Sequence, residues 1–284
     1  MTLKIGNVSL ETVSGGRFRL DGGAMFGVVP KPLWSKRSEP DELNRIALAT
    51  NCVLIQTDDL KVIIDTGYGE KLSEKEHAIY EIETHRGLLA NLAEFGLAAA
   101  DINMVIFSHL HFDHAGGGTV HNEAGTIVPA FPEATYCVQQ REWDVATSGL
   151  GCWQAGYPME NLSPLAEHGQ LKLIDGDAEI APGIRCALTG GHSPGHQLVI
   201  VESEGQRAVY MGDLCPTWSH LQQMWCMAYD LDLAAVRQTK PKTLGWLADE
   251  DAWVLSDHDP EFAAVRLQRD SKREFVISEA RPSC

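Results

Sequence analysis

Three histidines and one aspartate stand within six residues, in the segment His109-Leu-His111-Phe-Asp113-His114, directly after the apolar run Met104–Phe107. The apolar run predicts a short buried strand, so the polar side chains lie on the loop that leaves it. Imidazole and carboxylate groups are ligands of zinc and neighbouring transition metals. Because adjacent loop residues point in different directions, the loop can serve two ions, with His109 and His111 at one and Asp113 and His114 at the other. The alternative is a histidine-rich turn without metal.

Three further candidates follow predicted strands in the second half of the chain. His192 follows Ile184–Leu188, Asp213 follows Arg207–Met211, and His258 follows Trp253–Leu255. Functional side chains often collect on loops at strand ends. Each residue alone is equally compatible with a capping or surface position, but together with the first loop they complete two coordination shells. We expect the nearby His196 to be structural or to support a ligand.

The remaining pattern predicts a mixed α/β chain of two strand-rich halves that form one domain over residues 1–284, with two sheets face to face and helices outside. Residues 21–45 are rich in Gly, Pro and charge and predict an irregular lid or arm. Helices are expected at Arg86–Phe95, Gln139–Ala146 and between Leu231 and Ala248, the last interrupted by Pro241. The other expected strands are Leu3–Val13 and Arg17–Leu20, which form a hairpin around Ser14–Gly16, then Leu48–Gln56, Lys61–Asp65, Ala134–Val138, Leu171–Ile174 and Gln197–Glu202. Trp253–Leu255 is expected to be the last strand.

Composition restricts the class of partner. A net charge of −16 repels phosphate backbones, so nucleic acid is not expected. No apolar stretch is long enough to predict a membrane span. The N-terminus lacks a signal-peptide pattern, and the odd count of seven cysteines without CxxC spacing argues against a disulfide framework. We therefore expect a cytoplasmic protein.

The complete pattern resembles the metallo-β-lactamase superfamily. The resemblance rests on HLHFDH, the segment GGHSPGH around His192, Gly212-Asp213 and the late His258, and it extends from about Asn51 to His258. It implies a four-layer αββα sandwich with the site at one edge of the two sheets. The implied ligands are His109, His111 and His192 for one ion, Asp113, His114 and His258 for the other, and Asp213 as the bridge. Asp65, in the segment IIDTG, is implied to support the metal loop.

This resemblance implies a dinuclear hydrolase. Two divalent ions about 3.5–4 Å apart can share a bridging hydroxide and lower the pKa of bound water toward about 7. The hydroxide would attack a carbonyl or phosphoryl centre, and Asp113 would handle the proton. Zinc is the expected metal, while iron, manganese and cobalt also suit the ligand types.

Within the superfamily, the segments Asp21–Lys31, Gly212–Thr217 and Met227–Asp230 resemble bacterial quorum-quenching lactonases, which open N-acyl-homoserine lactones. Four other branches of the superfamily are not expected. Asp213 as a bridging ligand argues against true β-lactamases, and the length argues against flavodiiron proteins. The full ligand set argues against persulfide dioxygenases, and the net charge argues against nucleases. A phosphotriesterase or arylesterase of the same fold, with promiscuous lactonase activity, stays open as the alternative. A non-enzymatic metal-binding protein or sensor is the third reading.

The substrate side of the site is less constrained by the sequence. Lactonases of this type carry a tyrosine three residues after the bridging aspartate, whereas this chain has Pro216. His220 or Tyr229 is the expected replacement. Met25, Phe26 and Phe112 are expected to line an apolar pocket for a small lactone or ester. The stretch Met25–Trp34 is also expected to form a lid or a homodimer arm, and Cys215 is expected to pack at a strand end or to approach the metals.

Overall fold

The first sheet contains the N-terminal strands. In a computed structural model, which describes residues 1–82, 87–150 and 156–283, seven strands pair in the order β1-β2-β3-β4-β5-β8-β9. Pairing is antiparallel from β1 to β4 and parallel from β4 to β9. Their bounds are β1 Thr2–Ile5, β2 Val8–Asp21, β3 Arg45–Gln56, β4 Lys61–Ile64, β5 Met104–Ile106, β8 Thr135–Gln139 and β9 Leu171–Ile174.

The second sheet contains the C-terminal strands in the order β10-β11-β12-β13-β14-β15-β16. Only the β13–β14 pair is parallel among these described strands. Their bounds are β10 Ala178–Ala181, β11 Ile184–Leu188, β12 Gln197–Ser203, β13 Gln206–Tyr210, β14 Trp253–Leu255, β15 Phe262–Asp270 and β16 Glu274–Pro282. A small separate hairpin pairs β6 Thr119–His121 with β7 Ile127–Pro129.

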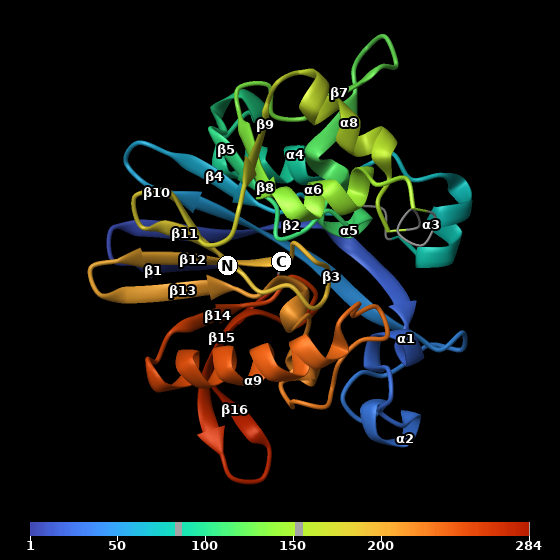
Figure 1. Cartoon of the computed structure of the whole chain (residues 1–284), viewed down its shortest axis with the longest axis vertical. Helices are drawn as coiled ribbons and strands as arrows, with labels where there is room; N and C mark the ends of the chain where they lie inside the picture. The colour runs from blue at the N-terminus through green and yellow to red at the C-terminus, as the bar shows by residue number, and fades with distance from the viewer. Residues whose placement is uncertain (83–86, 151–155, 284) are drawn as a thin grey trace.

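Helices cover the outer face of each sheet. Figure 1 shows α4 (Gly87–Leu92), α6 (Gln140–Thr147) and α8 (Met159–Glu167) on one side of the two sheets and α9 (Leu233–Asp249) on the other. The four-layer αββα arrangement expected from the sequence is therefore confirmed. The other described helices are α1 Gly22–Phe26, α2 Lys31–Trp34, α3 Glu74–Tyr80 and α5 Phe112–Ala115, with 3-10 turns at Ala93–Phe95, Ala99–Asp101, Gly116–Gly118, Gly212–Leu214 and Trp218–His220.

Alternation of apolar side chains explains why the sheets stack. In β3, Val53 and Ile55 join a core cluster that also contains Val199 and Val201 of β12, so this cluster fills the space between the sheets. The intervening Leu54 packs in a different cluster with residues of α4 and α8. Strands that are apolar on both faces are expected where a sheet is covered on both sides.

The expected position of the N-terminal hairpin is wrong. The hairpin turn lies at Gly6, whose φ is 54°, between β1 and β2. The segment Ser14–Gly16 is instead a bulge within β2 opposite β3. A Cβ on Gly15 would lie only 3.0 Å from the Cα of Gly67, so the glycine permits close packing of two chain segments rather than a reversal.

The segment 21–45 is also more ordered than expected, since it contains α1 and α2. Asp21 caps α1 by accepting a hydrogen bond from the backbone N–H of Ala24 at 2.8 Å. Helices of four or five residues are too short to produce a period in the sequence. Three of their apolar side chains, Met25, Phe26 and Trp34, are buried, which anchors the segment to the body of the protein.

The described part of the helix expected from Arg86 is α4, Gly87–Leu92, and Arg86 itself lies outside the described residues. A 3-10 turn, Ala93–Phe95, follows α4 and ends at Gly96, whose φ of 72° agrees with the expected stop signal. The strands β15 and β16 were not expected after Trp253–Leu255. Most of β16 is at least partly exposed, so it lacks the apolar pattern of a core strand.

No helix among residues 1–82, 87–150 and 156–283 is long and apolar enough to cross a membrane. Five cysteines in the described part are buried: Cys52, Cys137, Cys186, Cys215 and Cys226. Cys215 belongs to the apolar cluster between the second sheet and α9, which agrees with a packing role.

Candidate metal centre

Two pairs of parallel strands bring the candidate ligands to one edge of the sandwich. The pairing of β4 with β5 places Asp65 beside Ser108 and His109. The pairing of β13 with β14 places the segment containing Asp213 beside the one containing His258. Because the carboxyl ends of parallel strands meet at the same edge, residues distant in sequence become neighbours.

The loop after β5 turns into the short helix α5 and packs tightly against the loop after β4. The backbone N–H of Thr66 donates to the carbonyl of His114 at 2.7 Å, and that of Gly117 donates to Gly67 at 3.0 Å. A Cβ on Gly116 would lie 2.4 Å from the carbonyl oxygen of Tyr68. This close approach requires glycine after the metal loop.

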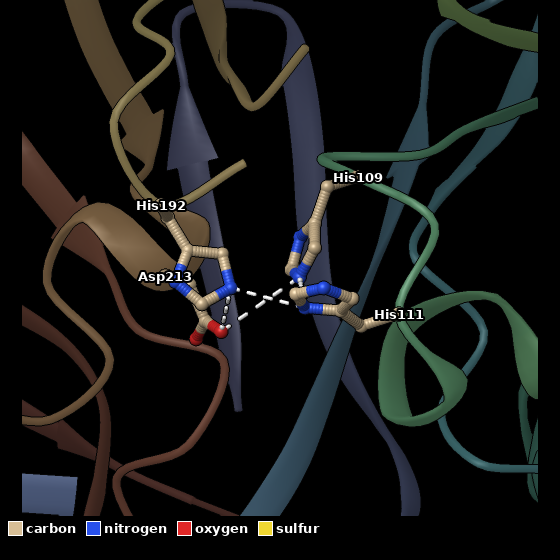
Figure 2. A group of neighbouring side chains, drawn as sticks. All are labelled: His109, His111, His192 and Asp213. Carbon is tan, nitrogen blue, oxygen red and sulfur yellow. Dashed lines mark hydrogen bonds and ion pairs between the residues drawn. The ribbon is translucent and has the colours of Figure 1, made fainter. Parts of the chain in front are cut away.

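The first donor group consists of His109, His111, His192 and Asp213 (Figure 2). His111 Nδ1 lies 2.9 Å from His109 Nε2 and 3.1 Å from His192 Nε2. Asp213 Oδ2 lies 2.9 Å from His192 Nε2 and 3.7 Å from His109 Nε2. A tetrahedral ion with bonds of about 2.0–2.1 Å holds its ligand atoms about 3.3 Å apart, so these spacings suit zinc.

A second donor group lies beside the first and shares Asp213. Its compact core consists of His114, His258, Asp213 and Asp257. Asp213 Oδ1 lies 3.4 Å from His258 Nε2, and Asp257 Oδ2 lies 3.4 Å from the same nitrogen. Asp113 also approaches, with Oδ2 3.4 Å from His258 Nε2. All seven residues that were expected to bind metal therefore converge.

Buried polar atoms without partners support the presence of ligands here. Among the described residues, His114 Nε2, Asp213 Oδ1 and both carboxylate oxygens of Asp257 are buried and make no hydrogen bond. Buried polar groups in proteins are nearly always paired, so unpaired atoms aimed at one region indicate an ion. The donor types and spacings fit two divalent cations.

Further contacts orient the imidazole rings from behind. Asp65 lies 2.9 Å from His114 Nδ1 and accepts hydrogen bonds from Ser108 and from the Tyr210 hydroxyl. Asp230 lies 3.0 Å from His192 Nδ1, and the Ala49 carbonyl lies 2.8 Å from His258 Nδ1. Such partners fix the tautomer and orientation of metal-binding histidines.

Glu142 of α6 joins two of the ligand loops. It is fully buried, and its carboxylate accepts hydrogen bonds from the backbone N–H of Leu110 at 3.1 Å and of Gly195 at 3.0 Å. The hydroxyls of Ser193 and Tyr157 donate to it at 2.7 and 2.9 Å. Leu110 separates His109 from His111, and Ser193 follows His192, so one carboxylate positions both loops.

The pKa values of the donor groups are shifted by burial and by the charges of neighbouring donor groups. Burial lowers the pKa of His109 and His111 well below the usual value, and adjacent imidazoles lower it further. Burial opposes the charged form of His192 as well, but Asp213 and Asp230 together outweigh it and raise the pKa to about 10. Burial raises the pKa of Asp257 to about 7. Cations would replace the protons in such a cluster, so metal binding is expected to release protons.

A pocket of about 410 Å³ opens above the two donor groups. Its floor contains His111, Asp113, His192, Asp213 and His258. Its walls are largely apolar and aromatic: Leu20, Met25, Phe112, Met227, Ala228, Leu231, Tyr80, Tyr157 and Tyr229. Met25, Phe112 and Tyr229, three of the residues singled out in the sequence, line this pocket, and its volume is typical of small-molecule sites.

Two expected site residues do not reach the pocket. Phe26 is fully buried behind Met25 and stacks on the His220 ring with 4.7 Å between the ring centroids. His220 is fully buried, with Nε2 donating to the Met25 carbonyl at 2.8 Å and Nδ1 2.8 Å from the Thr217 hydroxyl. Because both ring nitrogens are engaged, His220 is a structural support for α1 and not a substitute for the missing tyrosine.

His196 is buried beside the ligands and lies 2.6 Å from the Thr189 hydroxyl through Nδ1, which agrees with a supporting position. Sequence reasoning missed Asp257, Asp230 and Glu142. Asp257 directly precedes His258, so the pattern Asp-His-Asp contained a usable signal. Asp230 and Glu142 lie far in sequence from the rings they position, and no local pattern identifies them.

Comparison with known proteins places this site in a family. An N-acyl homoserine lactonase of Bacillus cereus is 29% identical over 171 residues, which are 57% of this chain and 61% of that protein. The chain thus matches less than two thirds of the length of this curated relative.

Solved structures extend the similarity to the whole chain. A probable metal-dependent hydrolase from Staphylococcus aureus is 36% identical, with a TM-score of 0.90, and the match covers 99% of this chain and 98% of that one. The dizinc quorum-quenching lactonase AidC, in complex with a product, has a TM-score of 0.78 at 21% identity over 100% and 97% of the two chains, a likeness of fold.

A profile of a protein family also matches this chain. The profile described as the metallo-beta-lactamase superfamily matches residues 45–253, well over half of the chain. This range contains six of the seven predicted metal ligands, all except His258. Together with the αββα fold, this match shows that the chain belongs to the metallo-beta-lactamase superfamily.

Proposed function

We propose that this protein is a dinuclear metal-dependent hydrolase that opens lactone rings of the N-acyl-homoserine type. One observation carries the proposal: two donor groups share Asp213 on the floor of a pocket whose walls are apolar. Two divalent ions bound there would activate water and polarise a carbonyl oxygen. The curated relatives that act on acyl homoserine lactones support this substrate class.

The residues of the pocket would have separate roles in this reaction. Phe112 and Met25 contact the pocket and would bind the acyl chain, while the floor residues orient the lactone carbonyl. Asp113 lines the pocket and would accept the proton of the attacking water, while Tyr229 would donate a proton to the departing ring oxygen and regain one from Asp113. Burial and then Asp21 and Asp113 raise the pKa of Tyr229 to about 12, so its phenol keeps a proton to donate to the departing oxygen.

The test is a hydrolysis panel on the metal-replete protein. It compares homoserine lactones of several acyl lengths with a phosphotriester, an aryl ester and a β-lactam. We expect the highest kcat/KM for the lactones. A phosphotriester or aryl ester that exceeds every lactone by tenfold or more would replace this proposal with the esterase alternative.

Pocket variants test the placement of the acyl chain. Phe112→Ala is expected to raise KM more for long acyl chains than for short ones, because it removes an apolar wall. Leu33→Ala, at an exposed position outside the pocket, is the matched control and is expected to leave KM unchanged. Equal effects of Phe112→Ala on short and long chains would place the acyl chain elsewhere.

A further inference from the structure

The side chain of Asp257 is buried in the interior of the metal centre with no hydrogen-bond partner. Its exposed fraction is 1%, and neither carboxylate oxygen makes a hydrogen bond within the described residues. A carboxylate in this position is costly unless a cation compensates it. The burial therefore requires an explanation that packing alone does not provide.

The backbone around Asp257 is held rigidly. Its carbonyl accepts a hydrogen bond from the Asn51 N–H at 2.7 Å, and the N–H of the next residue, His258, donates to the Pro216 carbonyl at 3.1 Å. The carboxylate is thus directed by contacts with β3 and with the loop after β13. Its direction does not depend on any exposed or adaptable segment.

The carboxylate faces the ring nitrogens of the second donor group. Oδ2 lies 3.6 Å from His114 Nε2 and 3.4 Å from His258 Nε2. These are the nitrogens that also face Asp213 and Asp113. Spacings of this size are typical of atoms that bind one cation.

Asp257 does not line the substrate pocket. It lines a narrow internal space together with Asp65, His114 and Tyr210. Asp113 lines both spaces, and Asp213 lines the open pocket. A substrate in the pocket would therefore not touch Asp257. Its effect would be confined to the ion.

We propose that Asp257 is an additional ligand of the second ion, which gives that position three carboxylates and two imidazoles. This inference rests on the dinuclear centre proposed above. The first position has three imidazoles and one carboxylate. Oxygen ligands suit harder ions such as manganese(II), and imidazoles suit zinc, so the second position should favour zinc over manganese less strongly than the first.

The experiment uses full-length protein stripped of metal with a chelator and then given one equivalent of zinc. Manganese(II) is titrated into this protein, and binding is followed by electron paramagnetic resonance and elemental analysis. The parent is expected to bind one manganese per chain. Asp257→Asn is expected to bind it at least tenfold more weakly while retaining the zinc.

Two control variants show whether the effect of Asp257→Asn depends on the position of the carboxylate or only on the loss of a negative charge. Asp58→Asn removes a carboxylate on an exposed turn and is expected to leave manganese affinity unchanged. Asp230→Asn removes the carboxylate behind His192 and is expected to weaken zinc at the first position more than manganese at the second.

Thermal unfolding supplies a readout that a merely structural residue would not produce. Metal-free Asp257→Asn is expected to unfold at a higher temperature than the metal-free parent, because a buried carboxylate without a hydrogen-bond partner is removed. With both ions present the order is expected to reverse. A lower unfolding temperature in both states would overturn the assignment.

The outcomes distinguish this inference from the proposed function. If the parent binds two ions and Asp257→Asn binds manganese as tightly as the parent, Asp257 is not a ligand, and the dinuclear centre stands. If the parent binds fewer than two ions per chain, both proposals fail together.

Discussion

At the scale of single residues, Glu142 shows how much of the centre depends on groups that never touch an ion. Its four hydrogen bonds hold the loops of His111 and His192 in register. Glutamine at this position would direct an amide NH₂ toward N–H and O–H donors. The carboxylate is therefore expected to matter for its acceptor capacity as well as its charge.

Glu142→Gln is expected to weaken ion binding at the first position by about 10–100-fold, as for other groups that orient metal-binding histidines. It should also lower the free energy of unfolding by about 1.5–3 kcal/mol, because buried hydrogen bonds to a charged group are lost. Zinc titration and denaturant unfolding measure the two effects. Asp144→Asn, on an exposed position of the same helix, is the control; equal behaviour of the two variants would contradict this role.

The phenol that assists the leaving group is a second residue-scale question. Tyr229 and Tyr80 both line the pocket, and burial raises the pKa of each. The Tyr80 ring stacks on Phe112 with 4.9 Å between centroids, whereas Tyr229 is 41% exposed. Tyr229 is therefore free to follow a departing oxygen, and Tyr80 serves as a wall.

Tyr229→Phe is expected to lower kcat for a lactone by about 10²-fold, the lower end of the contribution of a general acid. Its KM should change little because the ring stays in place. Tyr80→Phe, the matched control, should keep kcat within a few-fold. Steady-state kinetics with activated aryl esters sharpen the test, since a good leaving group needs no proton and should abolish the difference.

The seven ligands proposed from sequence are found together because histidine and aspartate at strand ends leave a visible pattern. His220 and Phe26 were placed wrongly because a buried ring with two hydrogen bonds looks the same in sequence as a catalytic one. Sequence also left Asp257 aside, since its significance depends on burial and missing partners.

At the scale of elements, α9 shows why a proline need not end a helix. The helix runs from Leu233 to Asp249 through Pro241, contrary to the expected interruption. Proline removes the N–H that would reach the carbonyl of Arg237. That carbonyl instead accepts a hydrogen bond from Gln223 Nε2 at 2.8 Å.

Gln223→Ala is expected to lower the free energy of unfolding by about 0.5–1.5 kcal/mol in the parent, the usual value of one such hydrogen bond. In a Pro241→Ala background the loss should be smaller, because the restored N–H can bond to Arg237. A double-mutant cycle by denaturant unfolding measures the difference. A coupling energy of zero would mean that the glutamine does not compensate for the proline.

Strand positions were predicted well for three short strands, β9, β11 and β14, which have the predicted bounds. The strand β14 is apolar and buried throughout, whereas β9 and β11 each contain one charged residue between apolar ones. The strand β16 was not predicted because most of its side chains are exposed or half-buried, so its sequence shows no clear alternation of apolar and polar residues. Pairing order could not be derived from the sequence, because it depends on contacts between strands far apart along the chain.

At the scale of the whole molecule, the metal centre joins the two sheets. His109, His111, Asp113 and His114 follow a strand of the first sheet, and the other ligands follow strands of the second. Without cations, the burial of so many carboxylates and imidazoles opposes this arrangement. Bound ions would therefore act as cross-links between the halves of the sandwich.

Removal of metal by a chelator is accordingly expected to lower the unfolding temperature. An ion present at about 1,000 times its Kd stabilises the folded state by about 4 kcal/mol. In a domain of this size each kcal/mol shifts Tm by about 2–4 °C, so loss of one ion should lower Tm by roughly 10 °C. Differential scanning calorimetry of the replete, stripped and reconstituted protein measures this shift. Since the stabilisation comes from ligands on both sheets, Asp213→Asn should lose most of the metal-dependent gain, whereas Asp58→Asn should keep it. A Tm that is the same with and without chelator would show that the sandwich is held together by its apolar core alone.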